Sequence, residues 1–554
     1  MRNVLLSLIM VTVLPVMSVT AADDAELAVL VPGTGTYSRV ISTDSEQAQA
    51  FFDQGLRLAW SFYFPESIAS YQEAARLDPT SPMPYFGLAH AAGPNPNSRY
   101  RQMPDDPKGA GLAAILKARE LAANGTQLEQ DLINAMFVLY DKAANRDSVK
   151  RDFAFLDAMR KLHKKYPDDA DIATLFGEAY MNTTRWDYWN ADGSAKEGTK
   201  EAQAAFETAM ASEHDHPGAN HLYIHLIEGS AQPELALPSA QKLEALAPIA
   251  GHMVHMPGHI YLRVGDYEKA ARTNVRSQVV DKQFAKIWGD TNFPLIGTYP
   301  LSHKIHRPHA LDFVRFANTL QGNYAAASKA ARQGASSAGE DPAMINRGQK
   351  RIVQSWMVEK IFGKWDLILN TKEPHNETPY LKGMWSYVKG SALVATGALE
   401  QAEIELNNLR QQITAEGVDD TGVDPTSASH LLNLAATGLL GELREAQGDL
   451  DGAIKTFDAA VKVEDNNRYI EPPDWPQSMR LYLGAALLAA NRAEEAEAIY
   501  RKDLEWNQKN GWATFGLYQA LEAQEHRLEE AKLVERQFKS FWRNADTELT
   551  RSHL

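Results

Sequence analysis

Two pairs of histidines recur in this chain at the spacing of a two-helix structural repeat. His221 and His225 are four residues apart, as are His255 and His259, and each residue of the first pair lies 34 positions before its counterpart in the second. Residues four apart share one face of a helix, and a repeat of this length holds two helices and their turns. The spacing therefore predicts a repeating helical array in which the two pairs lie side by side on one surface.

The rest of the chain carries the same helical pattern. Almost every segment reads as an amphipathic helix of roughly 12–18 residues with a short polar turn, and strand signals are nearly absent. In the C-terminal part, small residues such as Gly441 and Gly484 stand where paired helices touch, and aromatic residues such as Phe457 and Tyr500 fill between them. We predict an all-α solenoid in three parts, with N-terminal repeats at 45–200, His-rich central repeats at 201–335 and C-terminal repeats at 340–545.

Insertions interrupt the repeat period at 93–107, 186–198, 285–300 and 469–476. Loops of a solenoid often project onto one face and shape a pocket there. Two of these insertions hold aromatic clusters, at 186–189 and at 472–475, which are candidates for that role. The alternative is that they pack between irregular repeats.

The first residues predict export. Arg2 precedes an apolar run that ends in small residues, which is typical of a secretory signal peptide at 1–22, cleaved near Ala21 or Ala22. A short membrane anchor is less favoured because the run is short and contains Pro15. No later stretch is apolar for long enough to span a membrane. We expect a periplasmic or secreted protein.

Composition excludes several kinds of partner and site. The 554 residues are too many for one compact core, and the net charge of −15 argues against nucleic acid or an anionic membrane as a partner. The chain has no cysteine, which excludes disulfides, thiolate ligands and thiol nucleophiles. A metal would have to bind His, Asp, Glu, Met or backbone oxygen.

Ten of the 16 histidines lie between His214 and His309, in three segments. His221, His225 and Glu228 fall along one stripe of the first segment, and His252, His255 and His259 along one stripe of the second. In the third, His303, His306 and His309 recur every three residues. Pro257 predicts a late start or a kink in the second helix, and Pro308 predicts a third helix that starts near His306 or His309. As successive first helices, the three segments would line one groove.

These stripes predict a metal site. Our first choice of ligands is His221, His225, His255 and His259, while His216, His252, His303 and His306 are secondary ligands or hold a second metal. Imidazole suits zinc, copper, nickel and iron(II); Met253 and Met256 slightly favour copper, so copper or zinc is expected, with iron as a further candidate. Glu228 is a candidate base, ligand or orienting group, and Tyr261 a candidate acid or orienting group. A metal-free alternative is that neutral imidazoles bind a carboxylate or phosphate.

Other catalytic motifs are absent from the sequence. There is no His-Glu-x-x-His zinc-peptidase motif, no Walker A sequence, no Gly-x-Ser-x-Gly elbow and no Gly-x-Gly-x-x-Gly fingerprint. A standard metallopeptidase is therefore not supported.

Several longer motifs accompany the histidines. They are GPNPN at 93–97, WDYW at 186–189, HPGANH at 216–221, HMPGHIY at 255–261, His303 with His306, and EPP at 471–473. With them the mature chain resembles a group of bacterial tetratricopeptide-repeat (TPR) proteins, many of them exported. The resemblance implies a TPR superhelix whose first helices line its concave surface, and it implies no particular activity. The chain departs from the group at 299–303, where the first histidine comes later after the Tyr-Pro pair.

The first functional hypothesis is an exported TPR solenoid with a His-rich metal site in its concave groove, acting as a metal-dependent enzyme on a small organic substrate. Hydrolase, lyase and oxidase chemistry remain open. One alternative is a periplasmic protein–protein interaction scaffold that holds a peptide in the groove. Another is a metal-binding or carrier protein with exposed, exchangeable ligands.

Overall fold

The structure is a computed structural model that describes residues 26–96, 109–190, 193–289, 303–339, 347–372, 378–420 and 425–554, without the side chains of 303–305. Over these ranges the chain forms 25 α-helices and four short 3-10 helices, and its only β-type contact is an isolated bridge between Trp189 and Ala195. The predicted all-α class is confirmed. The predicted signal peptide at 1–22 lies outside the described residues.

The first half of the array comprises thirteen helices. They are α1 (Glu46–Trp60), α2 (Phe64–Leu77), α3 (Met83–Ala92), α4 (Ala110–Leu121), α5 (Gln127–Tyr140), α6 (Ser148–Lys165), α7 (Ala170–Thr184), α8 (Thr199–Ser212), α9 (Pro217–Ile227), α10 (Leu237–Leu246), α11 (Gly251–His255), α12 (Pro257–Arg263) and α13 (Tyr267–Trp288). The second half comprises twelve: α14 (His303–Leu320), α15 (Tyr324–Ala335), α16 (Gly348–Ile361), α17 (Trp365–Asn370), α18 (Pro379–Ala395), α19 (Leu399–Ile413), α20 (Ala428–Ala446), α21 (Leu450–Glu464), α22 (Met479–Ala489), α23 (Ala493–Trp506), α24 (Gly511–Glu522) and α25 (Leu528–Phe541).

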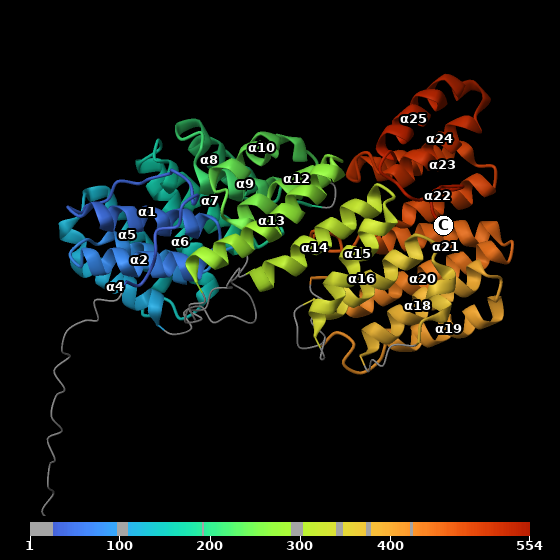
Figure 1. The fold of residues 1–554 in the computed structure, drawn as a ribbon, viewed down its shortest axis with the longest axis horizontal. Helices are drawn as coiled ribbons and strands as arrows, with labels where there is room; N and C mark the ends of the chain where they lie inside the picture. Colours follow the sequence, from blue (N-terminus) through green and yellow to red (C-terminus); the bar gives the residue numbers. More distant parts are fainter. Residues whose placement is uncertain are drawn as a thin grey trace, which may run out of the picture.

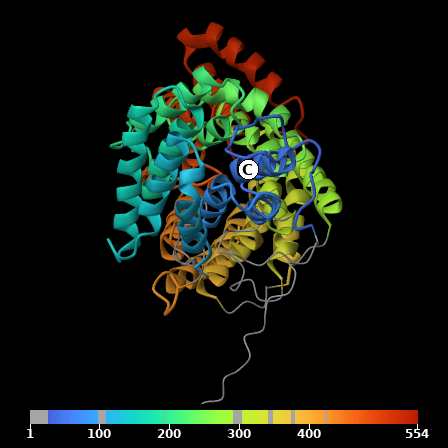
Figure 2. The same ribbon diagram turned by 90° about the vertical axis from the view of Figure 1, so that its left-hand side faces the viewer.

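Most helices pack against the next helix along the chain, which makes a TPR-like solenoid. Figure 1 shows α1 to α13 in one half of the molecule and α14 to α25 in the other, and Figure 2 shows the array curving when it is seen from the end. The two largest hydrophobic core clusters follow the same division, one spanning 28–288 and the other 327–534.

Small residues permit the close helix contacts that the repeat pattern predicts. A Cβ atom at Gly441 would lie 2.4 Å from the ring of Phe457, and one at Gly484 would lie 2.4 Å from the ring of Tyr500. Because both distances are far below van der Waals contact, these paired helices approach too closely for any side chain larger than hydrogen.

The three His-bearing segments are successive first helices of helix pairs. The first is α9, and the second is divided at Pro257 into α11 and α12, as the kink prediction allows. The third, α14, begins at His303, so the predicted start near His306 or His309 is wrong. Pro308 lies inside α14, beyond its first turn, and removes one backbone hydrogen bond from the helix.

No helix among the described residues is long and apolar enough to cross a membrane.

Candidate metal centre

Nine side chains from the three first helices and one loop form a continuous series of possible metal ligands. The series consists of His221, His225, Glu228, His252, His255, His259, His306, His309 and Glu471. They form four groups of three, within each of which the ligand atoms lie within 4.8 Å of one another. Neighbouring groups share His252, His255 or His259, so the series can hold more than one ion.

His216 is placed differently from the other predicted ligands. It is the N-cap of α9: its Nδ1 accepts the backbone N–H of Ala219 at 3.0 Å, and its Nε2 lies 3.0 Å from a carboxylate oxygen of Asp171. Pro217 then begins the helix, where a missing N–H costs nothing. Both ring nitrogens are engaged and none of the four groups contains this residue, so the structure assigns His216 to capping rather than to the ligand series.

Three of the remaining histidines are fixed through Nδ1. The Nδ1 of His221 lies 2.6 Å from the carbonyl oxygen of Trp60. That of His255 lies 2.5 Å from Oδ1 of Asn274, and that of His306 lies 2.6 Å from a carboxylate oxygen of Asp281. Each partner is an acceptor, so each Nδ1 carries the proton and each Nε2 keeps its lone pair. This outer hydrogen bonding is what orients histidine ligands in metal sites.

Two of these Nε2 atoms lie close to nitrogens of other imidazoles. Nε2 of His221 lies 3.0 Å from Nε2 of His252, and Nε2 of His255 lies 2.8 Å from Nε2 of His259. Three further buried nitrogens, Nε2 of His225, Nδ1 of His252 and Nε2 of His306, have no hydrogen-bond partner among the described residues. Unsatisfied buried nitrogens are costly. A metal–nitrogen bond of about 2.0–2.1 Å places two ligand nitrogens roughly 3–4 Å apart, so the donor set fits a transition metal.

Burial keeps most of these imidazoles neutral. It lowers the pKa of His221 to about 3. It also lowers the pKa values of His225, His252, His255 and His309 well below the ordinary value, and neighbouring imidazoles add to the effect. A neutral imidazole can bind a metal without first losing a proton.

His259 differs because two carboxylates face it. Its Nδ1 contacts the Glu228 carboxylate and lies 3.0 Å from the Glu471 carboxylate. Burial alone would lower the pKa of His259, but these two carboxylates raise it to about 10. Burial raises the pKa of Glu228 to about 8; Glu471 adds to this shift and His259 opposes it. The imidazole of His259 thus faces two buried carboxylates, with which it can share a proton.

Aromatic rings line the cluster. Phe62 contacts the rings of His221 and His252, with centroids 4.5 and 5.2 Å away. Its φ of 61° is left-handed, a conformation that costs about 1–2 kcal/mol for a residue with a Cβ. Trp186, from one of the two predicted aromatic loops, meets the ring of His225 edge-on at 5.0 Å. The loop residue thus borders the site.

Of the two other predicted site residues, only Tyr261 has a described side chain. Tyr261 packs in a small hydrophobic cluster with Phe313 and Phe316, with Lys269 5.4 Å above its ring, and it belongs to none of the ligand groups. Burial also raises the pKa of Tyr261, which makes it a poorer acid. The expected role for Tyr261 therefore lacks a contact with the site among the described residues. The side chain of His303 lies outside them.

Sequence reasoning missed several members of the site. His309 belonged to a recognised stripe but was left out of the expected ligands. Glu471 comes from a loop far along the chain, and its only signal was the EPP motif. Asn274 and Asp281, which fix His255 and His306, lie on α13, where nothing marked them.

No protein-family model and no curated protein matches the sequence. Similar solved structures include a monomeric mutant of IFIT1 with m7Gppp-AAAA, at 13% identity over 78% of this chain and 87% of that one, with a TM-score of 0.35. The human IFIT1 dimer with m7Gppp-AAAA has 12% identity over 78% of this chain and 86% of that one, with a TM-score of 0.33. Naa15/Naa10 bound to HypK-THB has 12% identity over 89% and 71%, with a TM-score of 0.22. These values are too low to bear on function.

Proposed function

We propose that this chain is an exported metalloprotein whose buried histidine series holds one or two transition-metal ions and acts as a metal-dependent enzyme on a small organic substrate. One observation carries the proposal: Nδ1 of each of three histidines is tied to a fixed acceptor while the Nε2 atoms converge. Export, to the periplasm or beyond, rests on the predicted signal peptide.

Burial favours a resident metal over a transported one. His221, His252, His255 and His259 are all at most 4% exposed. A carrier needs ligands that a partner protein can reach, whereas an enzyme gains from a fixed and dehydrated site. The metal-carrier alternative is therefore less favoured.

The metal is zinc, copper or iron in this proposal. Imidazole and carboxylate donors suit all three. Met253 and Met256 belong to the hydrophobic core cluster, which weakens the sulfur-based argument for copper. Glu228, with its raised pKa of about 8, is the proposed proton-transfer group for hydrolase, lyase or oxidase chemistry.

The proposal is tested by elemental analysis of the mature protein, purified without a histidine tag or chelator. We expect at least one equivalent of zinc, copper or iron, and loss of it in the His221→Ala/His255→Ala double variant with helicity retained. His214→Ala is the matched control, because the His214 side chain is 78% exposed and belongs to no ligand group. Absence of metal, together with no tight uptake of added zinc, copper or iron, would contradict the proposal.

The scaffold alternative keeps one supporting observation. The C-terminal repeats hold an extended segment of the chain itself, residues 545–554.

A further inference from the structure

The segment 545–554, here called the returning segment, runs back from α25 along the C-terminal repeats. Trp542 makes the turn: its indole N–H donates to the carbonyl of Thr547 at 2.8 Å, and its ring covers Gly322 and Gly511. From 545 to 550 half-buried and exposed residues alternate, and then Ser552 and His553 are buried. This period of two is that of an extended peptide lying on a surface.

Side chains hold the first part of the segment to several separate helices. The Asp546 carboxylate accepts the backbone N–H groups of Tyr324 at 2.6 Å and Ala325 at 2.9 Å, at the beginning of α15. The Gln519 amide of α24 donates to the carbonyl of Thr550 at 2.9 Å. Recognition is therefore spread across repeats, as in the binding of a separate peptide.

The last four residues are held more closely. Arg551 pairs with Glu445 of α20 at 2.6 Å. The Ser552 hydroxyl lies 2.8 Å from the Tyr500 hydroxyl and donates to the carbonyl of Leu481 at 2.8 Å. The charge of Arg551 and the hydroxyl of Ser552 are thus each matched by groups on α20, α22 and α23.

The ring of His553 lies in a pocket formed by side chains of several helices. Its ring stacks on Tyr482 with centroids 4.1 Å apart and planes at 24°. The Tyr482 hydroxyl in turn accepts from the ammonium group of Lys360 at 2.8 Å, and Lys360 pairs with Glu442 at 3.0 Å. Leu554 follows and packs at Gly363, in the turn after α16. The ring pocket is therefore assembled from α16, α20 and α22.

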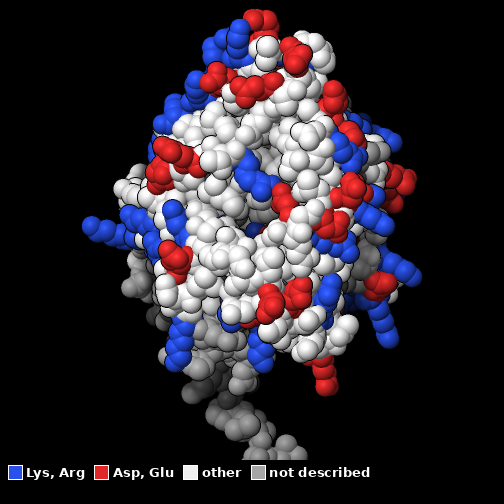
Figure 3. Space-filling model, turned by 90° about the vertical axis from the view of Figure 1, so that its right-hand side faces the viewer, with Lys and Arg blue, Asp and Glu red and all other residues white. Residues whose placement is uncertain are grey.

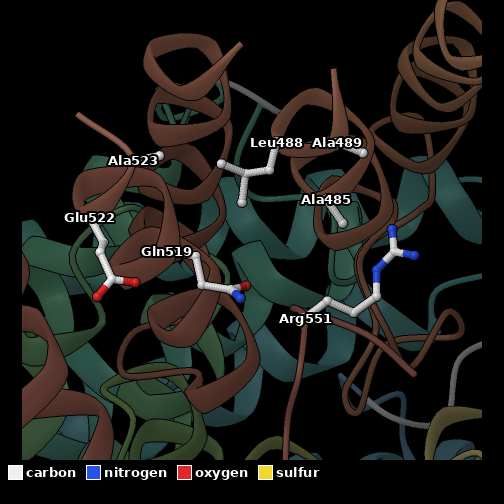
Figure 4. Close-up of a pocket in the computed structure, with 7 residues that line it drawn as sticks. All are labelled: Ala485, Leu488, Ala489, Gln519, Glu522, Ala523 and Arg551. Carbon is white, nitrogen blue, oxygen red and sulfur yellow. The ribbon is translucent and has the colours of Figure 1, made fainter. Parts of the chain in front are cut away.

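The groove continues beside the segment. An open pocket of about 430 Å³ lies between α22 and α24, lined by Ala485, Leu488, Ala489, Gln519, Glu522, Ala523 and Arg551. Figure 4 shows Gln519 and Arg551 on opposite sides of the pocket, with Leu488 above them. Figure 3, which faces this half of the molecule, shows a hollow with uncharged residues around much of it and a few charged side chains at its edge. A longer ligand would have room here.

The returning segment forms neither helix nor strand, so it is held on the repeats mainly by side-chain contacts. We propose that the inner groove of the C-terminal repeats is a peptide-binding site and that the returning segment is its resident ligand. The partner it fits is an extended peptide that presents a basic residue, a small hydroxyl, a ring and an aliphatic residue in the order of Arg551 to Leu554. Such a partner binds by displacing the resident segment. This inference is independent of the metal site.

The test is an exchange experiment on the full chain. A protease recognition sequence is inserted between Arg543 and Asn544, which are both exposed, and the folded protein is then cut there. A fluorescent peptide of residues 545–554 is added before and after the cut, and fluorescence anisotropy measures its binding. A tethered ligand acts at about millimolar effective concentration. We therefore expect weak binding before the cut and saturable binding of one peptide per chain after it, with unchanged helicity.

A matched peptide with His553→Ala should bind about tenfold more weakly or worse, because it loses the stacked ring. Three results would overturn the proposal. The first is that the cut chain keeps its own segment until its helicity is lost, which would make the segment a structural part of the fold. The second is that the segment leaves while the labelled peptide fails to bind. The third is that the His553→Ala peptide binds as tightly as the native one.

Discussion

The carboxylate of Asp281 positions the third helix of the metal centre through its hydrogen bond with His306. It is 3% exposed, and its carboxylate accepts from Nδ1 of His306 at 2.6 Å and from the Tyr63 hydroxyl at 2.5 Å. The Tyr63 oxygen also accepts the N–H of Gly251 at 2.9 Å, at the beginning of α11. One carboxylate on α13 thereby sets α11 and α14 against each other and fixes the proton of His306.

Asp281→Asn keeps the shape of this side chain and removes its charge. A hydrogen bond to a charged group contributes about 1.5–3 kcal/mol, and the loss of such a partner behind a histidine ligand typically weakens metal binding by about 10- to 100-fold. We expect a fall of this size in metal affinity, with unchanged helicity. Competition with a chromophoric chelator measures the affinity, and circular dichroism measures the helicity.

Asp503→Asn is the control. Asp503 is equally buried, at 2% exposed, and is hydrogen-bonded by the Asn510 amide among the C-terminal repeats. If Asp281→Asn binds metal as tightly as the unaltered chain, the orienting role is refuted. An equal loss in both variants would instead trace the effect to general destabilisation.

Three further predictions concern the stability of the fold. Gly441→Ala should destabilise the protein by about 1–3 kcal/mol in urea unfolding, because its Cβ would lie 2.4 Å from the Phe457 ring, whereas Gly448→Ala, with a φ of 82° and open space around it, should cost only about 1 kcal/mol. His216→Ala should leave metal content unchanged but cost about 1–3 kcal/mol of thermal stability, because α9 loses its cap and Asp171 a partner. Burial opposes ionisation of Asp171, but Arg39 and His216 hold its pKa below the ordinary value; this contributes stability that is present above about pH 4 and lost as pH falls further. Asp171→Asn should therefore be about 1–3 kcal/mol less stable at pH 7, because Arg39 loses one of its two carboxylate partners and keeps Asp169, and should lose less than the unaltered chain on going to pH 3, as urea unfolding at both pH values would show.

The sequence contains enough information to predict the array and the central ligands. The 34-residue spacing holds because α9 and the pair α11 and α12 are successive first helices, so His221 and His255 occupy equivalent places. Tyr261 could have been excluded on the same grounds, since it stands two positions after His259 and such residues do not share a helix face.

The outer partners could not be predicted because they are distant in sequence. The carbonyl that fixes His221 belongs to Trp60, and the second carboxylate beside His259 belongs to Glu471. Helical periodicity predicts which residues share a face of one helix, and repeat spacing predicts which residues of neighbouring repeats lie side by side. Neither predicts that a turn near the start of the chain packs against α9. The start of α14 was missed for a different reason: proline favours the first position of a helix but does not require it, and α14 holds Pro308 in its interior despite the lost backbone hydrogen bond.

The most direct test of the central claim is an anomalous difference map from crystals of the protein, recorded at the absorption edge of the metal that it retains. The account predicts one or two peaks between α9, α11, α12 and α14, each about 2.0–2.2 Å from Nε2 atoms of the histidine series or from a carboxylate oxygen of Glu228 or Glu471. No peak there, or a peak only at an exposed residue such as His214, would contradict it.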